Sequence, residues 1–281
     1  MTSDAPIANA EMATAWETEG IGWAERWERY DRGVAAHHAE LLRVASVGDG
    51  EAVLDIGCGN GQVSRDLARR APAGTVLGVD LSTPMLDRAR ELAAAEGLRN
   101  AAFLRADAQV HPFDRAFDLV VSRFGTMFFS DRRAAFSHVA ASMRPGARLA
   151  MVVWQHRDDN AWLTTVLGSL FDGALPPPPP EEAPSPFSLA RPEHIIEVLE
   201  GAGLSEVTVE PRELPFWAGS DADDAFAFLR DVGNVRGVLD SLAEDERPAA
   251  LERLAGALAA HAGDDGVVLG SAVLLVSAVR R

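Results

Sequence analysis

The sequence contains no lysine and only one cysteine, and each scarcity excludes a class of protein. A phosphate-binding P-loop needs a lysine after its last glycine, so this chain cannot form one. Cys58 alone can form neither an intramolecular disulfide nor a cysteine-rich metal site. No apolar stretch reaches the roughly 18 residues of a membrane span, and residues 1–12 lack the basic and apolar regions of a signal peptide. We therefore expect a cytoplasmic protein without a membrane span.

Positive charge is also scarce. The formal net charge is -16, because 42 acidic residues outnumber 26 basic ones, all of which are arginine. An acidic surface repels phosphate backbones, so we expect no nucleic-acid partner. Hydrophobic residues make up 47% of the 281, which is enough for a large core and argues against disorder. The length fits one decorated α/β domain, as a monomer or homodimer.

The apolar pattern alternates between strands and helices. The first twenty residues are small and polar and are expected to be loose, whereas residues 23–46 show helical spacing. Apolar runs then predict seven strands, at residues 52–56, 75–79, 101–105, 117–121, 148–154, 204–210 and 267–279. Strand–helix alternation favours a Rossmann-like α/β fold with a seven-stranded, mostly parallel sheet and helices on both faces. An N-terminal helical cap and helical insertions would decorate it.

This pattern divides the chain into four parts. They are an N-terminal helical segment or lid (1–46), a cofactor-binding core (47–155), an insertion on the substrate side (156–191), and a segment that completes the sheet (192–281). The last part would carry a helical insertion at about 215–265. The proline-rich stretch 176–186 cannot be helix or sheet; it is expected to be a rigid surface loop, with an interaction motif as the alternative.

The stretch "VLDIGCGNGQ" (53–62) places three glycines directly after a buried strand. Glycines at 57, 59 and 61 permit positive φ and leave no Cβ between a ligand and the backbone. The spacing G-x-G-x-G differs from the G-x-G-x-x-G that binds a dinucleotide pyrophosphate. Asp55 would repel a pyrophosphate, but it would attract a ligand that carries a sulfonium and an ammonium group. The loop therefore favours a cationic ligand.

Asp80 lies 19 residues after Gly61, at the end of the second predicted strand. A carboxylate in this position accepts hydrogen bonds from ribose hydroxyls. Dinucleotide enzymes use the same arrangement, so Asp80 indicates a ribose without identifying the cofactor.

Taken in order, these motifs resemble those of class I S-adenosylmethionine-dependent methyltransferases. The resemblance covers residues 50–155 and rests on "VLDIGCGNGQV", "VLGVDLSTPML", "LRADAQVHPF", "FDLVVSRFGTMFF" and "RPGARLAMVVW". The flanking segments "GIGWAERWERYDRG", "PFSLARPEHI" and "DGVVLGSAVLLVSA" are more loosely similar to a bacterial branch near the ubiquinone and menaquinone C-methyltransferases. The resemblance implies S-adenosylmethionine as cofactor and S-adenosylhomocysteine as product.

The resemblance also implies roles for individual residues. Asp55 would lie near the methionine ammonium, Asp80 would hold the ribose, Asp107 would accept from the adenine amino group, and the N–H of Ala108 would donate to a ring nitrogen. The full set assigned to the cofactor is Asp55, Gly57, Cys58, Gly59, Asn60, Gly61, Asp80, Leu81, Met85, Asp107, Ala108, Ser122, Arg123, Trp23 and Tyr30. Trp23 or Tyr30 would close over the methionine part.

The acceptor side is less constrained. Methyl transfer from a sulfonium needs mainly alignment and exclusion of water; if a base is used, His156 or His37 is the candidate. The expected walls for a small apolar or aromatic metabolite, of the kind made in secondary metabolism, are Phe124, Phe128, Trp154 and Trp162. No metal site is expected. Two alternatives remain open at this point: an NAD(P)-dependent oxidoreductase of Rossmann type, and a non-catalytic S-adenosylmethionine-binding or regulatory protein.

Overall fold

A computed structural model describes residues 7–281, apart from 115, 172–174, 176, 179, 181 and 182. Its strands are β1 (Ala52–Ile56), β2 (Thr75–Asp80), β3 (Ala101–Arg105), β4 (Phe117–Arg123), β5 (Met143–Trp154), β6 (Leu204–Gly219), β7 (Ala262–Gly263) and β8 (Gly266–Arg280). Its helices are α1 (Ala10–Glu25), α2 (Trp27–Gly33), α3 (Ala35–Ala45), α4 (Gln62–Arg70), α5 (Thr83–Ala95), α6 (Arg132–Ala141), α7 (Ala161–Leu170), α8 (Pro192–Gly201), α9 (Ala222–Leu229), α10 (Gly233–Ser241) and α11 (Arg247–Ala259), with short 3-10 helices η1 (Thr126–Phe128) and η2 (Arg157–Asp159).

All the strands join one sheet in the order β3-β2-β1-β4-β5-β8-β6, with β7 paired to the start of β8. Strands β1 to β5 run parallel to one another, whereas β8 is antiparallel to β5, β6 and β7. The expected seven-stranded, mostly parallel sheet is therefore corrected to eight strands in a mixed sheet. The two-residue β7 is too short to show any alternation in the sequence.

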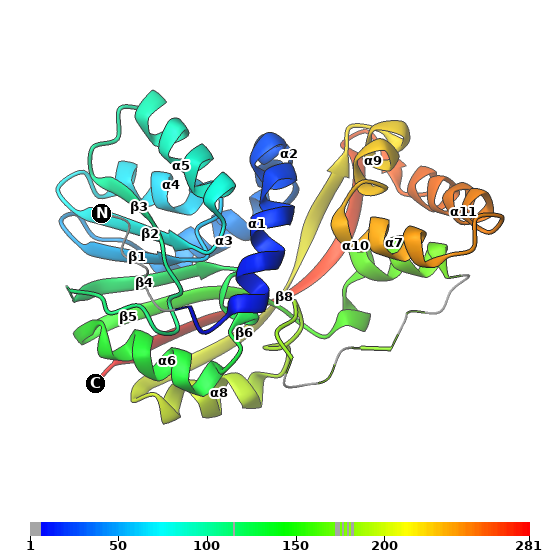
Figure 1. Ribbon diagram of the computed structural model, residues 1–281. Helices are drawn as coiled ribbons and strands as arrows, with labels where there is room; N and C mark the ends of the chain where they lie inside the picture. Colours follow the sequence, from blue (N-terminus) through cyan, green and yellow to red (C-terminus); the bar gives the residue numbers. More distant parts are fainter. Residues whose placement is uncertain (1–6, 115, 172–174, 176, 179, 181–182) are drawn as a thin grey trace.

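Helices cover both faces of the sheet (Figure 1). On one face, α3 and α4 pack on alternate strand residues such as Val53 and Leu119. On the other face, α6 and α8 pack on residues such as Leu54 and Val120. Because neighbouring residues of each strand face opposite layers, these strands are apolar almost throughout, as parallel strands covered on both sides must be.

The N-terminal segment is more ordered than its composition suggested. Helix α1 begins at Ala10, so the expectation that the first twenty residues are loose is wrong from that point onward. The helix is fixed by its contact with α5, where Gly20 lies directly against Ser82 and close to Met85. Tertiary packing of this kind overrides weak local propensity. Residues 1–6 lie outside the described part of the chain.

The long pair β6–β8 extends beyond the parallel sheet and carries a second group of helices, α7, α9, α10 and α11, with its own core (Figure 1). The strand predicted at 204–210 continues to Gly219 through Pro211 and Pro215. An edge strand tolerates proline because one side of it needs no ladder hydrogen bond. The helices predicted at about 215–265 therefore begin only at Ala222. Part of the proline-rich stretch 176–186 lies outside the described residues.

Candidate functional site

A cavity of about 550 Å³ opens at the carboxyl ends of β1, β2 and β4 and continues toward the helices carried by β6 and β8. One end is lined by the glycine loop and by the carboxylates of Asp55, Asp80 and Asp107. The other end is lined mainly by aromatic and aliphatic side chains from α7, α9 and β6. Ligands of open α/β sheets bind at this edge of the strands. The cavity thus has a polar end and an apolar end.

The loop between β1 and α4 folds tightly against two neighbouring strands. Gly57, Gly59 and Gly61 have φ values of 67°, 52° and 76°, a region that side chains rarely adopt. The N–H of Gly57 donates to the carbonyl of Val79 over 2.9 Å, and a Cβ on Gly57 would lie 2.7 Å from the Cα of Gly125. At Gly59, by contrast, the nearest heavy atom to an added Cβ is the Met85 sulfur at 3.7 Å, so a side chain there would enter the cavity.

Asp80 is held by backbone donors and keeps capacity for more. Its Oδ2 accepts from the N–H of Gly59 at 2.8 Å, and its Oδ1 accepts from the N–H of Ser82 at 3.0 Å. Burial raises the pKa of this carboxyl, while hydrogen bonds from the backbone of Ser82, Gly59 and Leu81 oppose that rise. Because each carboxylate oxygen can accept two hydrogen bonds, Asp80 keeps acceptor capacity for a donor from the cavity.

Asp55 lies deeper, at the end of β1, and is 1% exposed. Its Oδ2 accepts from the Ser64 hydroxyl at 2.6 Å. Burial raises its pKa from the ordinary 3.8 to about 6, and this effect outweighs the opposing hydrogen bond from Ser64 and the nearby positive charge of Arg123. Asp55 is therefore a carboxylate whose charge is easily lost and is stabilised by a cation.

Asp107 differs from the other two carboxylates because the N-terminal segment occupies it. Its Oδ2 accepts from the N–H groups of Ala8 and Asn9 at 2.9 and 2.8 Å. Its Oδ1 accepts from the Asn9 side-chain amide at 2.7 Å and from the N–H of Gln109 at 3.0 Å. The neighbouring Ala108 lines the same cavity. The expected adenine contact of Asp107 thus meets a carboxylate that already has four donors.

Trp23, Tyr30 and Arg123, which were expected near the cofactor, all lie in the cavity wall. Trp23 and Tyr30 stack with their ring centroids 3.7 Å apart, and burial raises the pKa of Tyr30 to about 12. The side chain of Arg123 extends into the cavity wall, where it donates to Gln62 and lies 3.5 Å from Asp31 Oδ1. Burial raises the pKa of Asp31, and Arg123 opposes this rise. The resemblance assigned Arg123 to the cofactor set but gave no role to Asp31.

The apolar end includes the four predicted wall residues. Phe124 and Trp154 stack with centroids 4.1 Å apart, and Trp162 lies 5.2 Å from Trp154. Phe128 packs edge-on against Trp16, which the sequence analysis missed. Phe124 also has φ 63°. A bulky residue in this region is strained by about 1–3 kcal/mol, and such strain concentrates at functional sites.

The two histidines predicted as candidate bases, His37 and His156, lie outside the lining of the cavity. Neither histidine proposed as a base is among the described residues that line the cavity. The His156 side chain is 60% exposed beside Asp158, while His37 is fully buried with Nε2 2.7 Å from the Ser271 hydroxyl. Burial lowers the pKa of His37 to about 4, so it is neutral at pH 7. No group of three metal-binding side chains occurs among the described residues.

Ser122 and Gly61 support the loop from below rather than from the cavity. The Ser122 hydroxyl donates to the carbonyl of Ile56 at 2.8 Å. A Cβ on Gly61 would lie within 3 Å of Phe103 and Ala89. The remaining predicted cofactor residues, Cys58, Asn60, Leu81 and Met85, line the cavity. Cys58 is buried, and burial raises the pKa of its thiol, so a reactive thiolate is disfavoured there.

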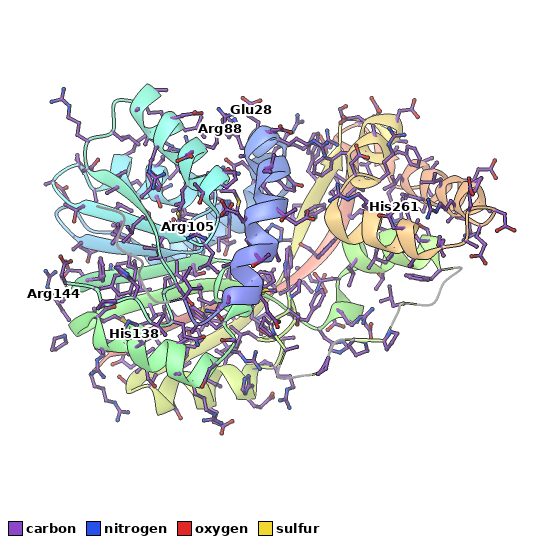
Figure 2. The ribbon with its side chains drawn as sticks, in the orientation of Figure 1. Glu28, Arg88, Arg105, His138, Arg144 and His261 are labelled. Carbon is purple, nitrogen blue, oxygen red and sulfur yellow. The ribbon has the colours of Figure 1, made fainter. Side chains whose placement is uncertain are left out.

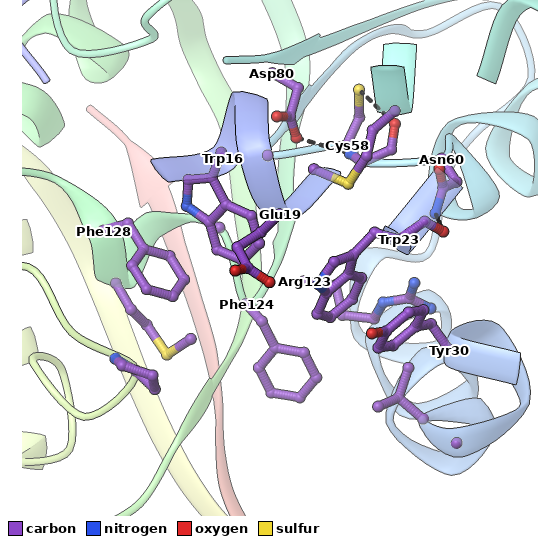
Figure 3. A pocket seen from close by; sticks show the side chains of 18 of the residues that line it. Trp16, Glu19, Trp23, Tyr30, Cys58, Asn60, Asp80, Arg123, Phe124 and Phe128 are labelled. Atoms are coloured by element: carbon purple, nitrogen blue, oxygen red, sulfur yellow. Dashed lines mark hydrogen bonds between the residues drawn. The ribbon is translucent and has the colours of Figure 1, made fainter. Parts of the chain in front are cut away.

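Helix α1 contributes two side chains that the sequence analysis missed. Trp16 and Glu19 point into the space between Phe124, Phe128 and Trp23 (Figure 3). Positions 16, 19 and 23 share one face of a helix. That spacing was visible in the sequence, but it was overlooked because residues 1–20 were expected to be loose.

Comparisons with known proteins agree with the resemblance of residues 50–155 to methyltransferases. Residues 53–146 match the family described as "Methyltransferase domain". The chain is 41% identical over 101 residues to demethylmenaquinone methyltransferase of Thermus thermophilus, covering 36% of this chain and 46% of that protein. It is 35% identical over 112 residues to aklanonic acid methyltransferase DauC of a Streptomyces species, covering 39% and 51%.

Among solved structures, phosphoethanolamine N-methyltransferase 2 of Haemonchus contortus, in complex with phosphomonomethylethanolamine and S-adenosylhomocysteine, aligns with a TM-score of 0.58 at 20% identity. The alignment covers 98% of this chain and 60% of that one, and shows a shared fold. The chain spans about half the length of the curated relatives it matches. Residues 53–146 therefore match a methyltransferase domain, in agreement with the resemblance to class I S-adenosylmethionine-dependent methyltransferases, and the similar proteins include a demethylmenaquinone methyltransferase.

Proposed function

We propose that this protein transfers the methyl group of S-adenosylmethionine to a small apolar or aromatic metabolite, releasing S-adenosylhomocysteine. The observation that carries the proposal is a single cavity that joins the polar glycine-loop end to an aromatic end. A methyl donor and an acceptor must meet within one water-poor space, and this cavity provides one. The methyltransferase-domain match favours this function over a nicotinamide-dependent oxidoreductase.

The residues at the polar end fit the proposed cofactor. The free acceptor capacity of Asp80 suits the two ribose hydroxyls, and Asp55 suits the ammonium group because a cation would stabilise its charged form. The absence of a Cβ on Gly59 leaves room for the ligand on the loop. Arg123 in the cavity wall suits the methionine carboxylate. These assignments follow from charge and hydrogen-bonding capacity and remain proposals.

The aromatic end supports a small apolar acceptor. Trp162 lies between the core beneath the sheet and the core of the helices carried by β6 and β8, because it packs against both. Phe216 continues this wall with a centroid 5.7 Å from Trp162. Pockets for drug-sized ligands occupy about 300–1,000 Å³ and are lined mainly by such side chains. The relatives named for demethylmenaquinone and aklanonic acid suggest a polycyclic or quinone-like acceptor.

When bound, S-adenosylmethionine supplies a methyl group that is already activated on a sulfonium. The chain needs only to align this group with the acceptor and to exclude water. Trp16, Trp23 and Phe124 surround the point where the two ends of the cavity meet (Figure 3). Glu19, Tyr30 and Asp31 are titratable side chains of the N-terminal helices that line the cavity. A general base is required only if the acceptor must lose a proton.

Titration calorimetry tests the cofactor, with S-adenosylmethionine, S-adenosylhomocysteine and NADH as ligands. We expect the first two to bind and NADH not to bind; binding of NADH alone would refute the proposal. The acceptor class is tested by mass spectrometry after incubation with quinols and aromatic polyketides, in which a gain of one methyl group is expected. Cofactor binding without methylation of any panel member would favour a non-catalytic binding protein.

The expectation that nucleic acid is not the acceptor forms part of the same proposal. Within the described part of the chain, no helix is long and apolar enough to cross a bilayer.

A further inference from the structure

Helix α1 forms a cover across the carboxyl ends of the strands and is fixed to the core by polar contacts along its length. Near its middle, Glu17 accepts from the N–H of Thr83 at 3.0 Å. At its end, the carbonyl of Ala24 accepts from Arg88 Nε at 3.2 Å, and Arg88 lies beside the end of this helix in Figure 2. Because Trp16 and Trp23 project from α1 into the cavity, its position shapes the cofactor end.

The fixation at the start of α1 depends on Asp107. An ionised carboxylate offers about four acceptor positions, and all four are used: three by residues 8 and 9 and one by Gln109. Asp107 is only 2% exposed. A further donor, such as an adenine amino group, could bind this carboxylate only by displacing one of these four.

The Asn9 side chain binds Asp107 and does not cap its own helix. It occupies the N-cap position of α1, where an asparagine side chain ordinarily accepts from a backbone N–H of the first turn. Here the side chain makes no such bond. Its Nδ2 donates to Asp107 and its Oδ1 accepts from the N–H of Ser130 at 2.6 Å. With 4% exposure, Asn9 connects α1 to two loops at the strand ends.

We propose that Asn9 and Asp107 form a latch that holds α1 closed over the cofactor end. On this view Asp107 is a positioning residue: it supports cofactor binding through α1 and not by a bond to the adenine amino group. The inference rests on the proposed function, because it presumes that the covered end binds the methyl donor. It departs from the adenine-contacting role that the resemblance implied for Asp107.

The first test compares two ligands on the Asp107→Asn variant. One is S-adenosylhomocysteine, and the other is its analogue with hydrogen in place of the 6-amino group. The amide nitrogen of the new asparagine would face backbone or side-chain N–H groups that now donate to a carboxylate oxygen. We therefore expect the Kd of S-adenosylhomocysteine to rise roughly tenfold. A latch predicts the same factor for both ligands. If the loss occurs with S-adenosylhomocysteine and disappears with the analogue, Asp107 contacts the amino group directly and the latch is refuted.

The second test leaves Asp107 intact and changes its partner. Asn9→Asp places a second carboxylate against Asp107, and like charges at this distance repel. The latch predicts weaker binding of S-adenosylhomocysteine, again by roughly tenfold. If residues 8 and 9 instead compete with adenine for Asp107, their release would leave binding unchanged or make it tighter, and the proposal would fail. Thr14→Asp is the matched control, since it adds the same charge at an exposed position of α1.

Amide hydrogen exchange of residues 8–25 reports the latch without relying on ligand affinity. In the free protein, Asn9→Asp should exchange faster than wild type and Thr14→Asp should not. Addition of S-adenosylhomocysteine to wild type should slow exchange; faster exchange of residues 8 and 9 would contradict the latch. If wild type binds neither S-adenosylmethionine nor S-adenosylhomocysteine, the proposed function fails, while the ligand-free comparison still decides the latch.

Discussion

The pKa of Asp55 leads to a prediction in which pH acts in opposite directions on stability and on cofactor binding. In the folded protein, burial raises the pKa of this carboxyl from 3.8 to about 6. Asp55 therefore favours the folded state most at low pH, where it is protonated in both states. This contribution is lost as pH rises through about 6, because the buried group must then carry a charge.

The magnitude follows from the size of the rise in pKa. A pKa difference of one unit corresponds to about 1.4 kcal/mol, so the full contribution amounts to about 3 kcal/mol, of which about 2.4 kcal/mol is lost between pH 4 and 7. The neutral variant Asp55→Asn cannot ionise. Its free energy of unfolding should therefore gain about 2.4 kcal/mol on that of wild type over this interval. Asp80 also has a pKa raised by burial, and because its charge contributes to the raised pKa of Asp55, the two carboxyls titrate as a coupled pair.

Cofactor binding should change in the opposite direction. If the charged carboxylate binds the methionine ammonium, affinity is highest above pH 6. At pH 5 only about one-tenth of Asp55 is ionised, so Kd for S-adenosylmethionine should be about tenfold higher than at pH 7. Asp55→Asn should bind more weakly at pH 7 and lose most of this dependence.

Two measurements check the pair of effects: denaturant unfolding of both proteins between pH 4 and 7, and calorimetric titration at pH 5, 6 and 7. Wild-type affinity that stays constant from pH 5 to 7 would refute the link between the charge of Asp55 and the ammonium group. An unchanged difference in stability between the two proteins would show instead that Asp55 is solvated in the fold.

Three further predictions concern the cofactor loop and the acceptor wall. Asp80→Ala should weaken binding of S-adenosylhomocysteine by about 1–3 kcal/mol in a calorimetric titration, the range for unpairing such groups; unchanged affinity would contradict the ribose assignment. Gly59→Ala and Gly50→Ala should each destabilise the fold by about 1–2 kcal/mol, because both glycines have positive φ and no close neighbour. Only Gly59→Ala should abolish cofactor binding in the same titration, since Gly50 lies away from the cavity. Trp162→Ala should leave cofactor affinity within twofold while lowering kcat/KM for the acceptor at least about tenfold; an equal loss in both would place Trp162 in the fold alone.

Much of the parallel sheet could be predicted because its central strands are buried on both faces. The run at 52–56 coincides with β1 and the run at 117–121 lies within β4, since a covered strand must be apolar along its whole length. The antiparallel strands β6 and β8 are harder to predict. In β6 the exposed fraction alternates and two prolines interrupt the pattern, so the strand seemed to end nine residues early. Its full length is set by pairing with β8, which is a non-local interaction.

The polar end of the cavity could be predicted because it is formed by features of short segments. Positive φ at Gly57, an acidic residue at the end of β1 and another at the end of β2 are features of a short segment. The role of Asp107 could not be predicted in the same way. Its partners, Ala8 and Asn9, are about 100 residues away in sequence, and nothing in the spacing indicates that they fill its acceptor positions.

The acceptor end could not be read from the sequence for a more general reason. A tryptophan on α7 or a phenylalanine on β6 has the same pattern whether it faces a core or a cavity. Whether these side chains face the cavity depends on the pairing of β6 with β8, because this pairing holds helices α7, α9 and α10 against the cavity. On the proposed function, donor recognition depends on residues 53–123 together with helix α1, whereas acceptor recognition depends largely on residues 161–235. The two can therefore diverge separately, so that a change in these helices would alter the acceptor while leaving the glycine loop and its donor unchanged.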